Sequence, residues 1–373
     1  MALPLPRERG SIRAKHAMTE RRTAVRVVDR LVGALADRRV RYVFGVDGAN
    51  IEDVYDALAL TAAPIAGIVA KHEFGAATMA DGAARSTGGL GVVVATSGGG
   101  ALNLVAGLGE ASASRVPVLA LVGQPQTTLE GRGAFQDSSG LSGTIDAVTL
   151  FAQVSRYCAR VERPEDLDGH LSRAVSAATA GGPAVLLLPK DVQQAAADPW
   201  SPGSIAPTAA VDAPDIGALA AALDRARRRG KIVVVAGDEV ARADARAEFA
   251  DLVRVLDASV GVAPDAKDVV DPDTRGYCGV AGVMGHPELV DAVRCSELCL
   301  LVGTRMPVLA RVGPDELMRR VTVVSLGHAP PYLPSTHTGT GDLRAALRAL
   351  VEDRKSTRQN SSHQVQSRMP SSA

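Results

Sequence analysis

The sequence predicts an α/β protein with two doubly wound domains, each built on a parallel sheet covered by helices. Two apolar runs rich in β-branched residues, Gly91–Ala95 and Val116–Val122, have the continuous hydrophobicity of strands buried on both faces. Strand-like and helix-like segments alternate along the chain, which is typical of this fold class. A length of 373 residues is enough for two domains with a core each.

The first domain is expected over residues 20–195, after an N-terminus (1–19) that we expect to be disordered. The strand predicted at Tyr42–Val46 ends at a turn that begins with Asp47 and Gly48. A helix is expected directly after the glycine cluster Gly98–Gly100, and another directly after Glu73. The remaining elements are helices over 23–37 and 51–60 and strands over 66–69 and 184–188.

A Pro- and Ala-rich linker, residues 196–214, precedes the second domain, which is expected over residues 215–351. Here the same alternation recurs, which again predicts a parallel sheet. The expected helices are 216–228, 242–256, 287–294 and 342–350, and the expected strands are 232–236, 259–262 and 298–302.

Residues 352–373 differ from the rest of the chain. They are polar, rich in Ser and Gln, and without periodicity, which predicts a disordered tail. The segment DRKSTRQNSSH, Asp353–His363, is similar to one reading frame of a widely used sequencing adapter, with Gln359 where that frame gives Leu. We therefore expect the tail to be an artefact and the natural gene to have been interrupted at about residue 352.

Charge and composition exclude several function classes. Lys and Arg number 41, as do Asp and Glu, so the formal net charge is zero and no basic footprint for nucleic acid or an anionic membrane is expected. No apolar run reaches membrane-spanning length, and no signal peptide is apparent at the N-terminus. Four irregularly spaced cysteines give neither a disulfide framework nor a metal site, so we expect a cytoplasmic protein.

Glu73 is a candidate acid/base residue. It stands in front of a helix whose face is almost all small residues, so another element is expected to pack very close to this helix. A carboxyl group beside so much apolar surface is costly to ionise, which favours proton exchange near neutral pH. Alternatively, Glu73 is a solvated first-turn residue that the helix dipole stabilises.

The glycine cluster Gly98–Gly100 has two possible roles. It could let the backbone approach a ligand closely, or it could place N–H groups at a phosphate. A dinucleotide site is not favoured, because no G-x-G-x-x-G follows a strand here with an acidic residue placed for a ribose. Asn103, in the helix that follows, is either a site residue or an amide on the helix surface.

Six motifs in order carry a resemblance to a known family. The first domain resembles the pyrimidine-binding domain of thiamine-diphosphate-dependent enzymes of the acetolactate synthase type, and the second resembles their central domain. The motifs are Val43–Gly48, Glu73 with Ala80–Arg85, Ser97–Asn103, Phe135–Asp137, Val154–Tyr157, and Gly182–Pro183 through Pro189–Val192.

The resemblance assigns Glu73 the role of the glutamate that activates thiamine diphosphate by a hydrogen bond to N1′ of its aminopyrimidine. It implies a 2-oxo acid substrate, decarboxylated with or without carboligation. Departures from the family are Asp47 for Pro, Gly99 for Pro, Asp137 for Glu and Arg156 for Lys, so a relative that acts on another 2-oxo acid or an acyl-CoA fits equally well. The implied cofactor-side residues are Asp47, Gly48, Gly98, Gly99, Gly100 and Asn103, and the substrate-side residues are Phe135, Gln136 and Arg156.

Some relatives hold FAD in the central domain, and the resemblance makes Arg173, Gly282 and Arg305 possible nucleotide contacts. The match is poor, since Met284 stands where FAD-binding relatives carry His. The alternative is that the two arginines are exposed residues at helix or strand ends.

The resemblance also implies a third domain that binds the diphosphate through Mg²⁺, with a Gly-Asp-Gly followed by Asn, and nothing in this sequence matches it. In this family the site forms between two subunits of a homodimer or homotetramer. We therefore expect this chain alone to be inactive and to expose an apolar interface. The alternative is a non-catalytic or split pyrimidine-side subunit that needs a separate diphosphate-binding partner.

Overall fold

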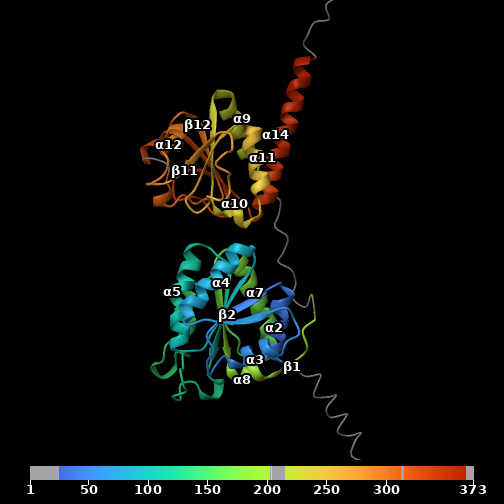
Figure 1. Cartoon of the computed structure of the whole chain (residues 1–373), viewed down its shortest axis with the longest axis vertical. Coiled ribbons are helices and arrows are strands. Elements are labelled where there is room, and N and C mark those ends of the chain that lie inside the picture. The colour runs from blue at the N-terminus through green and yellow to red at the C-terminus, as the bar shows by residue number, and fades with distance from the viewer. Residues whose placement is uncertain (1–24, 202, 204–214, 312–314, 367–373) are drawn as a thin grey trace, which may run out of the picture. The chain divides into compact units, whose positions relative to one another are not determined.

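The computed structural model describes residues 25–201, 203, 215–311 and 315–366, with side chains up to residue 354. The chain divides into two compact units, Met1–Thr208 and Ala209–Ala373 (Figure 1). The expected N-terminal segment 1–19 and most of the expected linker, residues 204–214, lie outside the described residues.

The first unit contains a six-stranded sheet in the order β3-β2-β4-β5-β7-β6, with all neighbouring strands parallel. Its strands are β2 (Tyr42–Gly45), β3 (Ala66–Val69), β4 (Gly91–Ala95), β5 (Val118–Gln124), β6 (Tyr157–Arg160) and β7 (Pro183–Pro189). A short antiparallel pair joins β1 (Val25–Arg26) to β8 (Ala196–Ala197). The α-helices are α2 (Val27–Asp37), α3 (Glu52–Leu60), α4 (Glu73–Thr87), α5 (Gly99–Ala113), α6 (Ala147–Ala152), α7 (Leu167–Thr179) and α8 (Lys190–Gln194).

The central strands of this sheet are buried on both faces, as their continuous apolar sequences predict. In β4, Val92 and Val94 pack in the core formed with α2, α3 and α7. The alternate residues Val93 and Ala95 pack in the opposite core, formed with α4, α5 and α6. The predicted doubly wound fold is thereby confirmed for this unit.

Helices α4 and α5 pack very closely, which explains the small residues after Glu73. A Cβ atom added at Gly107 of α5 would lie only 2.5 Å from Cβ of Ala77 in α4. Larger side chains here would push the helices apart. This contact holds α4, which begins with Glu73, against α5.

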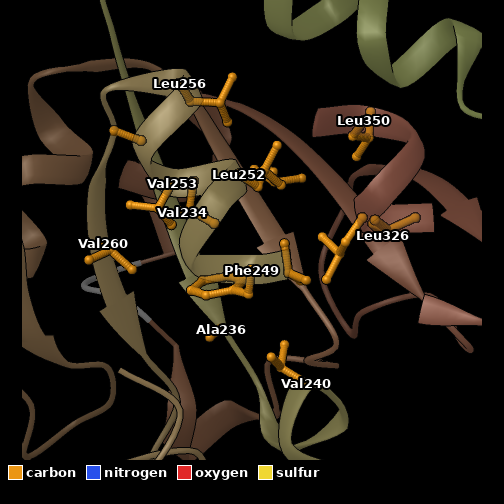
Figure 2. Close-up of a cluster of buried hydrophobic side chains, with 14 of the residues drawn as sticks. Val234, Ala236, Val240, Phe249, Leu252, Val253, Leu256, Val260, Leu326 and Leu350 are labelled. Carbon is orange, nitrogen blue, oxygen red and sulfur yellow. The ribbon is translucent and has the colours of Figure 1, made fainter. Parts of the chain in front are cut away.

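The second unit also contains a six-stranded parallel sheet, in the order β11-β10-β9-β12-β13-β14. One core lies between this sheet and α9, α11 and α14, with Phe249, Leu252 and Leu350 among its residues (Figure 2). Helices α12 and α13 cover the other face. The strands are β9 (Lys231–Ala236), β10 (Ser259–Val262), β11 (Tyr277–Val280), β12 (Ser296–Val302), β13 (Thr322–Gly327) and β14 (Thr336–Gly339), and the α-helices are α9 (Gly217–Arg229), α10 (Asp238–Arg242), α11 (Arg246–Leu256), α12 (Pro287–Arg294), α13 (Asp315–Arg320) and α14 (Leu343–Gln366).

Two predictions for this unit were wrong in detail. The helix expected over 242–256 begins only at Arg246, as α11, because Asp244 has a φ of 48° that no helix accepts, and Arg242 is instead the last residue of α10. The tail expected to be disordered from residue 352 is helical to Gln366. No Gly or Pro interrupts that stretch, and Arg354 is buried against Asp224 of α9. Among the described residues, no helix is long and apolar enough to span a membrane.

Candidate cofactor site

The carboxyl ends of β2, β4 and β5 carry most of the predicted site residues. Asp47 and Gly48 follow β2, the cluster Gly98–Gly100 follows β4, and the loop with Phe135 and Gln136 follows β5. Because these three strands are parallel neighbours, their carboxyl ends meet at one edge of the sheet. Ligands of doubly wound sheets bind at this edge.

Glu73 lies at the same edge as the first residue of α4. Its neighbour His72 caps the helix, with Nδ1 accepting a 3.1 Å hydrogen bond from the backbone N–H of Phe74. Glu73 is only 8% exposed, and its Oε2 accepts a 2.9 Å hydrogen bond from Nδ2 of Asn103 on α5. The predicted catalytic residue and a predicted cofactor-side residue are therefore in direct contact.

Because Gly100 has no side chain, there is room beside it for the Glu73 carboxylate. A Cβ atom at this position would lie 3.0 Å from Oε1 of Glu73 and 2.8 Å from Cγ2 of Thr96. At Gly99, by contrast, a Cβ atom would meet nothing within 4 Å. The backbone at the start of α5 is thus open on the Gly99 side and tight against Glu73 on the Gly100 side.

A buried polar network, which the sequence did not predict, supports this edge. Asn50 donates from Nδ2 to Oγ of Ser97 at 2.7 Å and to the carbonyl of Phe135 at 3.1 Å. Its backbone N–H donates to Oγ1 of Thr96 at 3.3 Å. Ser97 stands in one of the motifs that carry the family resemblance, whereas the sequence signal for Asn50 and Thr96 is polarity beside a predicted strand end, which ordinary turns share.

The predicted substrate-side residues Phe135 and Gln136 reach the same edge. A Cβ atom at Gly98 would lie 2.9 Å from Cβ of Gln136, and Oγ1 of Thr96 donates to Oε1 of Gln136 at 3.3 Å. Gln136 has a φ of 57°, a strained conformation that clusters at functional sites. Phe135 is 70% exposed, so its ring is free to contact a ligand.

Asp137 holds the loop after β5 in place. Although burial opposes ionisation, hydrogen bonds from the backbone N–H of Gly131 and from Ser139 lower the pKa of its carboxyl group. The family-typical Glu is one carbon longer, and here the shorter Asp serves as a turn-forming acceptor.

Arg156 does not join the site. Its backbone N–H donates to the carbonyl of Pro183, at the start of β7, and its Nε donates to the carbonyl of Gly181. These partners lie at the amino ends of the strands, opposite the edge that carries Glu73. Arg156 therefore lies about one strand length from the edge that carries Glu73, and this placement does not support the substrate-side role predicted for Arg156.

The three possible nucleotide contacts belong to different units and each has partners within its own unit. Arg173 lies in the first unit, where its Nε donates to the hydroxyl of Tyr157 at 3.0 Å. Arg305, in the second unit, stacks over the ring of Tyr332 at 4.0 Å. Gly282, with a φ of 122°, packs against the carbonyl of Leu309.

The residues at the edge of the first sheet fit the aminopyrimidine of thiamine diphosphate. A buried carboxylate is held by an amide through Oε2, and among the described residues no hydrogen-bond partner is present for its Oε1. An open backbone stretch at Gly99 lies beside it. Within the described ranges, no group of three or more His, Cys, Asp or Glu side chains is placed to hold a metal ion.

Comparisons with known proteins point to the same cofactor. Residues 25–142 match the family model "Thiamine pyrophosphate enzyme, N-terminal TPP binding domain", and residues 216–350 match "Thiamine pyrophosphate enzyme, central domain". The chain is 28% identical to the acetolactate synthase large subunit of Corynebacterium glutamicum over 93% of this chain and 55% of that protein. It is 30% identical to the acetolactate synthase of Arthrospira platensis over 86% of this chain and 57% of that protein.

A solved structure from Mycobacterium smegmatis, described as a candidate thiamin diphosphate-dependent enzyme, has a similar fold. The TM-score is 0.75 at 21% identity, and the match covers 88% of this chain and 62% of that one. The chain thus spans a little more than half the length of the acetolactate synthases that it matches over most of its own length. By its two matching domains, the chain belongs to the thiamine pyrophosphate enzyme family, of which it carries the N-terminal cofactor-binding domain and the central domain.

Proposed function

We propose that this chain forms the pyrimidine side of a thiamine diphosphate site in an acetolactate synthase-like enzyme that decarboxylates a 2-oxo acid, with or without carboligation. The observation that carries this proposal is the buried Glu73 carboxylate, fixed by Asn103 beside the open backbone at Gly99. When bound, thiamine diphosphate supplies an electron sink for the negative charge that decarboxylation leaves next to a carbonyl carbon.

Glu73 acts as the proton-holding residue in this proposal. Its Oε1, on the side away from Asn103, would share a proton with N1′ of the aminopyrimidine. Asn103 holds Oε2 and so leaves Oε1 available to N1′ in this proposal. Burial keeps competing water away, which strengthens the hydrogen bond.

The substrate lies beside the loop after β5 in the same proposal. Phe135 offers an exposed ring, and Gln136 offers an amide held at the site edge by Thr96. Asp47 is exposed at the end of β2, with Oδ1 accepting from the N–H of Gly48 at 2.8 Å. An additional carboxylate there disfavours a strongly anionic substrate close to Asp47.

The diphosphate and its Mg²⁺ need protein groups other than those described here, and two arrangements supply them. In the first, they belong to the same polypeptide in its natural form, and this sequence is a truncated version. In the second, this chain is a split subunit that a separate diphosphate-binding chain completes. A genomic read through the codons for residues 340–373 and beyond, in search of a Gly-Asp-Gly followed by Asn, distinguishes one continuous frame from two genes.

We also propose that a homodimer or homotetramer forms through the outer face of α4 and α5. Phe74, Met79 and Leu102 are 46%, 45% and 40% exposed on these helices. Large apolar side chains left this exposed are typical of an interface. Gel filtration with light scattering tests this: Met79→Glu should shift an oligomer to monomer, whereas a monomeric wild type would refute it.

The proposed compartment is the cytoplasm, where the four cysteines would stay reduced.

The activity test is CO₂ release from pyruvate with thiamine diphosphate and Mg²⁺, by this chain alone and together with any diphosphate-binding polypeptide found by the genomic read. We expect release only in the second case. Release by neither preparation, for pyruvate and for longer 2-oxo acids, would refute the proposed function.

A further inference from the structure

The sheet of the second unit has one position where a dinucleotide would be expected. Its strand order reverses at β9, which has β10 on one side and β12 on the other. In doubly wound sheets, ligands bind outside the carboxyl ends of the two strands at such a reversal. In this unit those ends are Ala236 of β9 and Val302 of β12.

Glu239 fills this position with the protein's own carboxylate. Its Oε1 accepts a 2.9 Å hydrogen bond from the backbone N–H of His328, just after β13. A Cβ atom at Gly327 would lie 3.0 Å from Oε2 of Glu239, and one at Gly303 would lie 2.7 Å from its Cβ. The side chain therefore lies directly across the ends of β12 and β13.

The backbone at the strand ends is also engaged. The N–H of Gly237 donates to the carbonyl of Val302 at 2.8 Å, and the N–H of Gly303 donates to the carbonyl of Leu326 at 2.8 Å. A dinucleotide site needs such N–H groups free to donate to the pyrophosphate. Glycine at position 237 allows the segment after β9 to pack directly against the segment after β12. A Cβ atom at Gly237 would lie 2.2 Å from the carbonyl oxygen of Gly303.

The charge at this position opposes a pyrophosphate as well. Asp238 and Glu239 form the acidic first turn of α10, a helix of five residues. Arg242 pairs with Asp238 at 3.2 Å. Glu239 forms no ion pair with a Lys or Arg side chain in the described part of the chain, and its titratable neighbour His337 of β14 has a pKa that burial lowers, although the Glu239 carboxylate opposes this. A pyrophosphate brought here would face a carboxylate at close range in a half-buried environment.

From this geometry we infer that the central unit excludes FAD and other dinucleotides, because Glu239 takes the place of the ligand's phosphate as an internal anion. The residues present do not fit FAD, which the resemblance to flavin-holding relatives had left possible. This inference is independent of the proposed reaction, since it concerns a different sheet and a different ligand.

Direct binding measurements with FAD and with ADP test the inference. The purified chain is titrated by equilibrium dialysis up to about 100 µM ligand, a range that detects micromolar affinity. Wild type is expected to bind neither ligand. Glu239→Gln, which removes the charge but keeps the side-chain volume, is also expected to bind neither, because the side chain still fills the space across the strand ends. Glu239→Gly, which removes the obstruction, is expected to gain at least about tenfold in affinity for ADP.

The matched control is Glu288→Gly, which removes an exposed acidic residue from the first turn of α12 and should leave binding at the wild-type level. Circular dichroism confirms that each variant is folded. Saturable FAD or ADP binding by wild type in this range would overturn the inference, and it can be measured even if Glu239→Gly does not fold. A folded Glu239→Gly that binds no better than wild type would overturn the role assigned to Glu239.

Discussion

Nδ2 of Asn103 donates a 2.9 Å hydrogen bond to Oε2 of Glu73, so that α5 orients the carboxylate at the start of α4. The two residues are 30 positions apart in the sequence and meet because α4 and α5 pack closely through small residues. This bond leaves the second carboxylate oxygen facing the backbone of Gly100. The proposed chemistry depends on that orientation.

Replacing Asn103 is expected to weaken the orientation of Glu73 without removing its carboxylate. Asn103→Ala should lower cofactor-dependent turnover about tenfold, a loss of the size that one hydrogen bond to a charged group contributes. Asn103→Asp should cost more, because it places two carboxylates side by side. Turnover and the apparent Kd for thiamine diphosphate are measured in the complete enzyme. Ser86→Ala, at the far end of α4, is the control, and equal activity of Asn103→Ala and this control would contradict the account.

Gly99 and Gly100 form a matched pair at the start of α5. Either change to Ala should favour the helix intrinsically by up to about 1 kcal/mol. Gly99→Ala meets open space, so its free energy of unfolding should equal or exceed that of wild type. Gly100→Ala should lower both stability and turnover, because the new methyl group crowds Oε1 of Glu73 and Cγ2 of Thr96. Urea unfolding measures both variants, and equal stabilities would show that Gly100 is not tightly packed.

The pH dependence of stability in the second unit should depend on Glu248. A hydrogen bond from Arg344 of α14, aided by Arg348, lowers the pKa of this carboxyl group to about 2. Because the folded pKa lies below that of the unfolded chain, the stabilisation is present above pH about 5 and is lost as the pH falls toward about 2.

Glu248→Gln tests this directly. At pH 7 it should lower the free energy of unfolding by about 1 kcal/mol, and the difference from wild type should shrink as the pH falls to about 3. Urea unfolding at several pH values gives both quantities. A difference that stays constant from pH 7 to pH 3 would mean that the Glu248 carboxylate contributes no pH-dependent stability.

Phe249 anchors the core of the second unit (Figure 2). Its side chain is 1% exposed, so Phe249→Ala should cost about 3–5 kcal/mol through lost burial and a cavity. Phe135→Ala is the control, because that ring is 70% exposed and should change stability by less than about 0.5 kcal/mol. Chemical unfolding followed by circular dichroism measures the two losses. Similar losses for the two variants would contradict the burial described here.

Much of this fold could be predicted from sequence because the buried strands have continuous apolar runs. Gly91–Ala95 and Ser259–Val262 were predicted with the bounds that the structure shows. The edge strands β6, β11 and β14 were not predicted, since they are short and half-buried and carry polar residues that resemble loops. The buried inner strand β13 was also missed, although most of its residues are apolar. The extension of α14 beyond Leu350 was missed because a polar composition alone does not reveal that Arg354 pairs with Asp224.

Part of the candidate site could be predicted because its residues belong to recognisable sequence motifs. Glu73, Asn103 and the glycine cluster follow a sequence pattern, and the strand order brings them together at one edge. Asn50, Thr96 and Ser97 support that edge through hydrogen bonds across 46 and 47 positions, which no local pattern encodes. Arg156 matched a motif in sequence, but its place at the amino end of β6 depends on strand direction.

The central claim is that the Glu73 carboxylate handles the proton on which cofactor activation depends. Its most direct test is CO₂ release from pyruvate by the complete enzyme with thiamine diphosphate and Mg²⁺, comparing wild type with Glu73→Gln, a variant that keeps the size and the bond to Asn103. We expect turnover to fall at least about a hundredfold, as for the loss of a general acid/base, with the fold unchanged by circular dichroism. Unchanged turnover in folded Glu73→Gln would remove Glu73 from the mechanism.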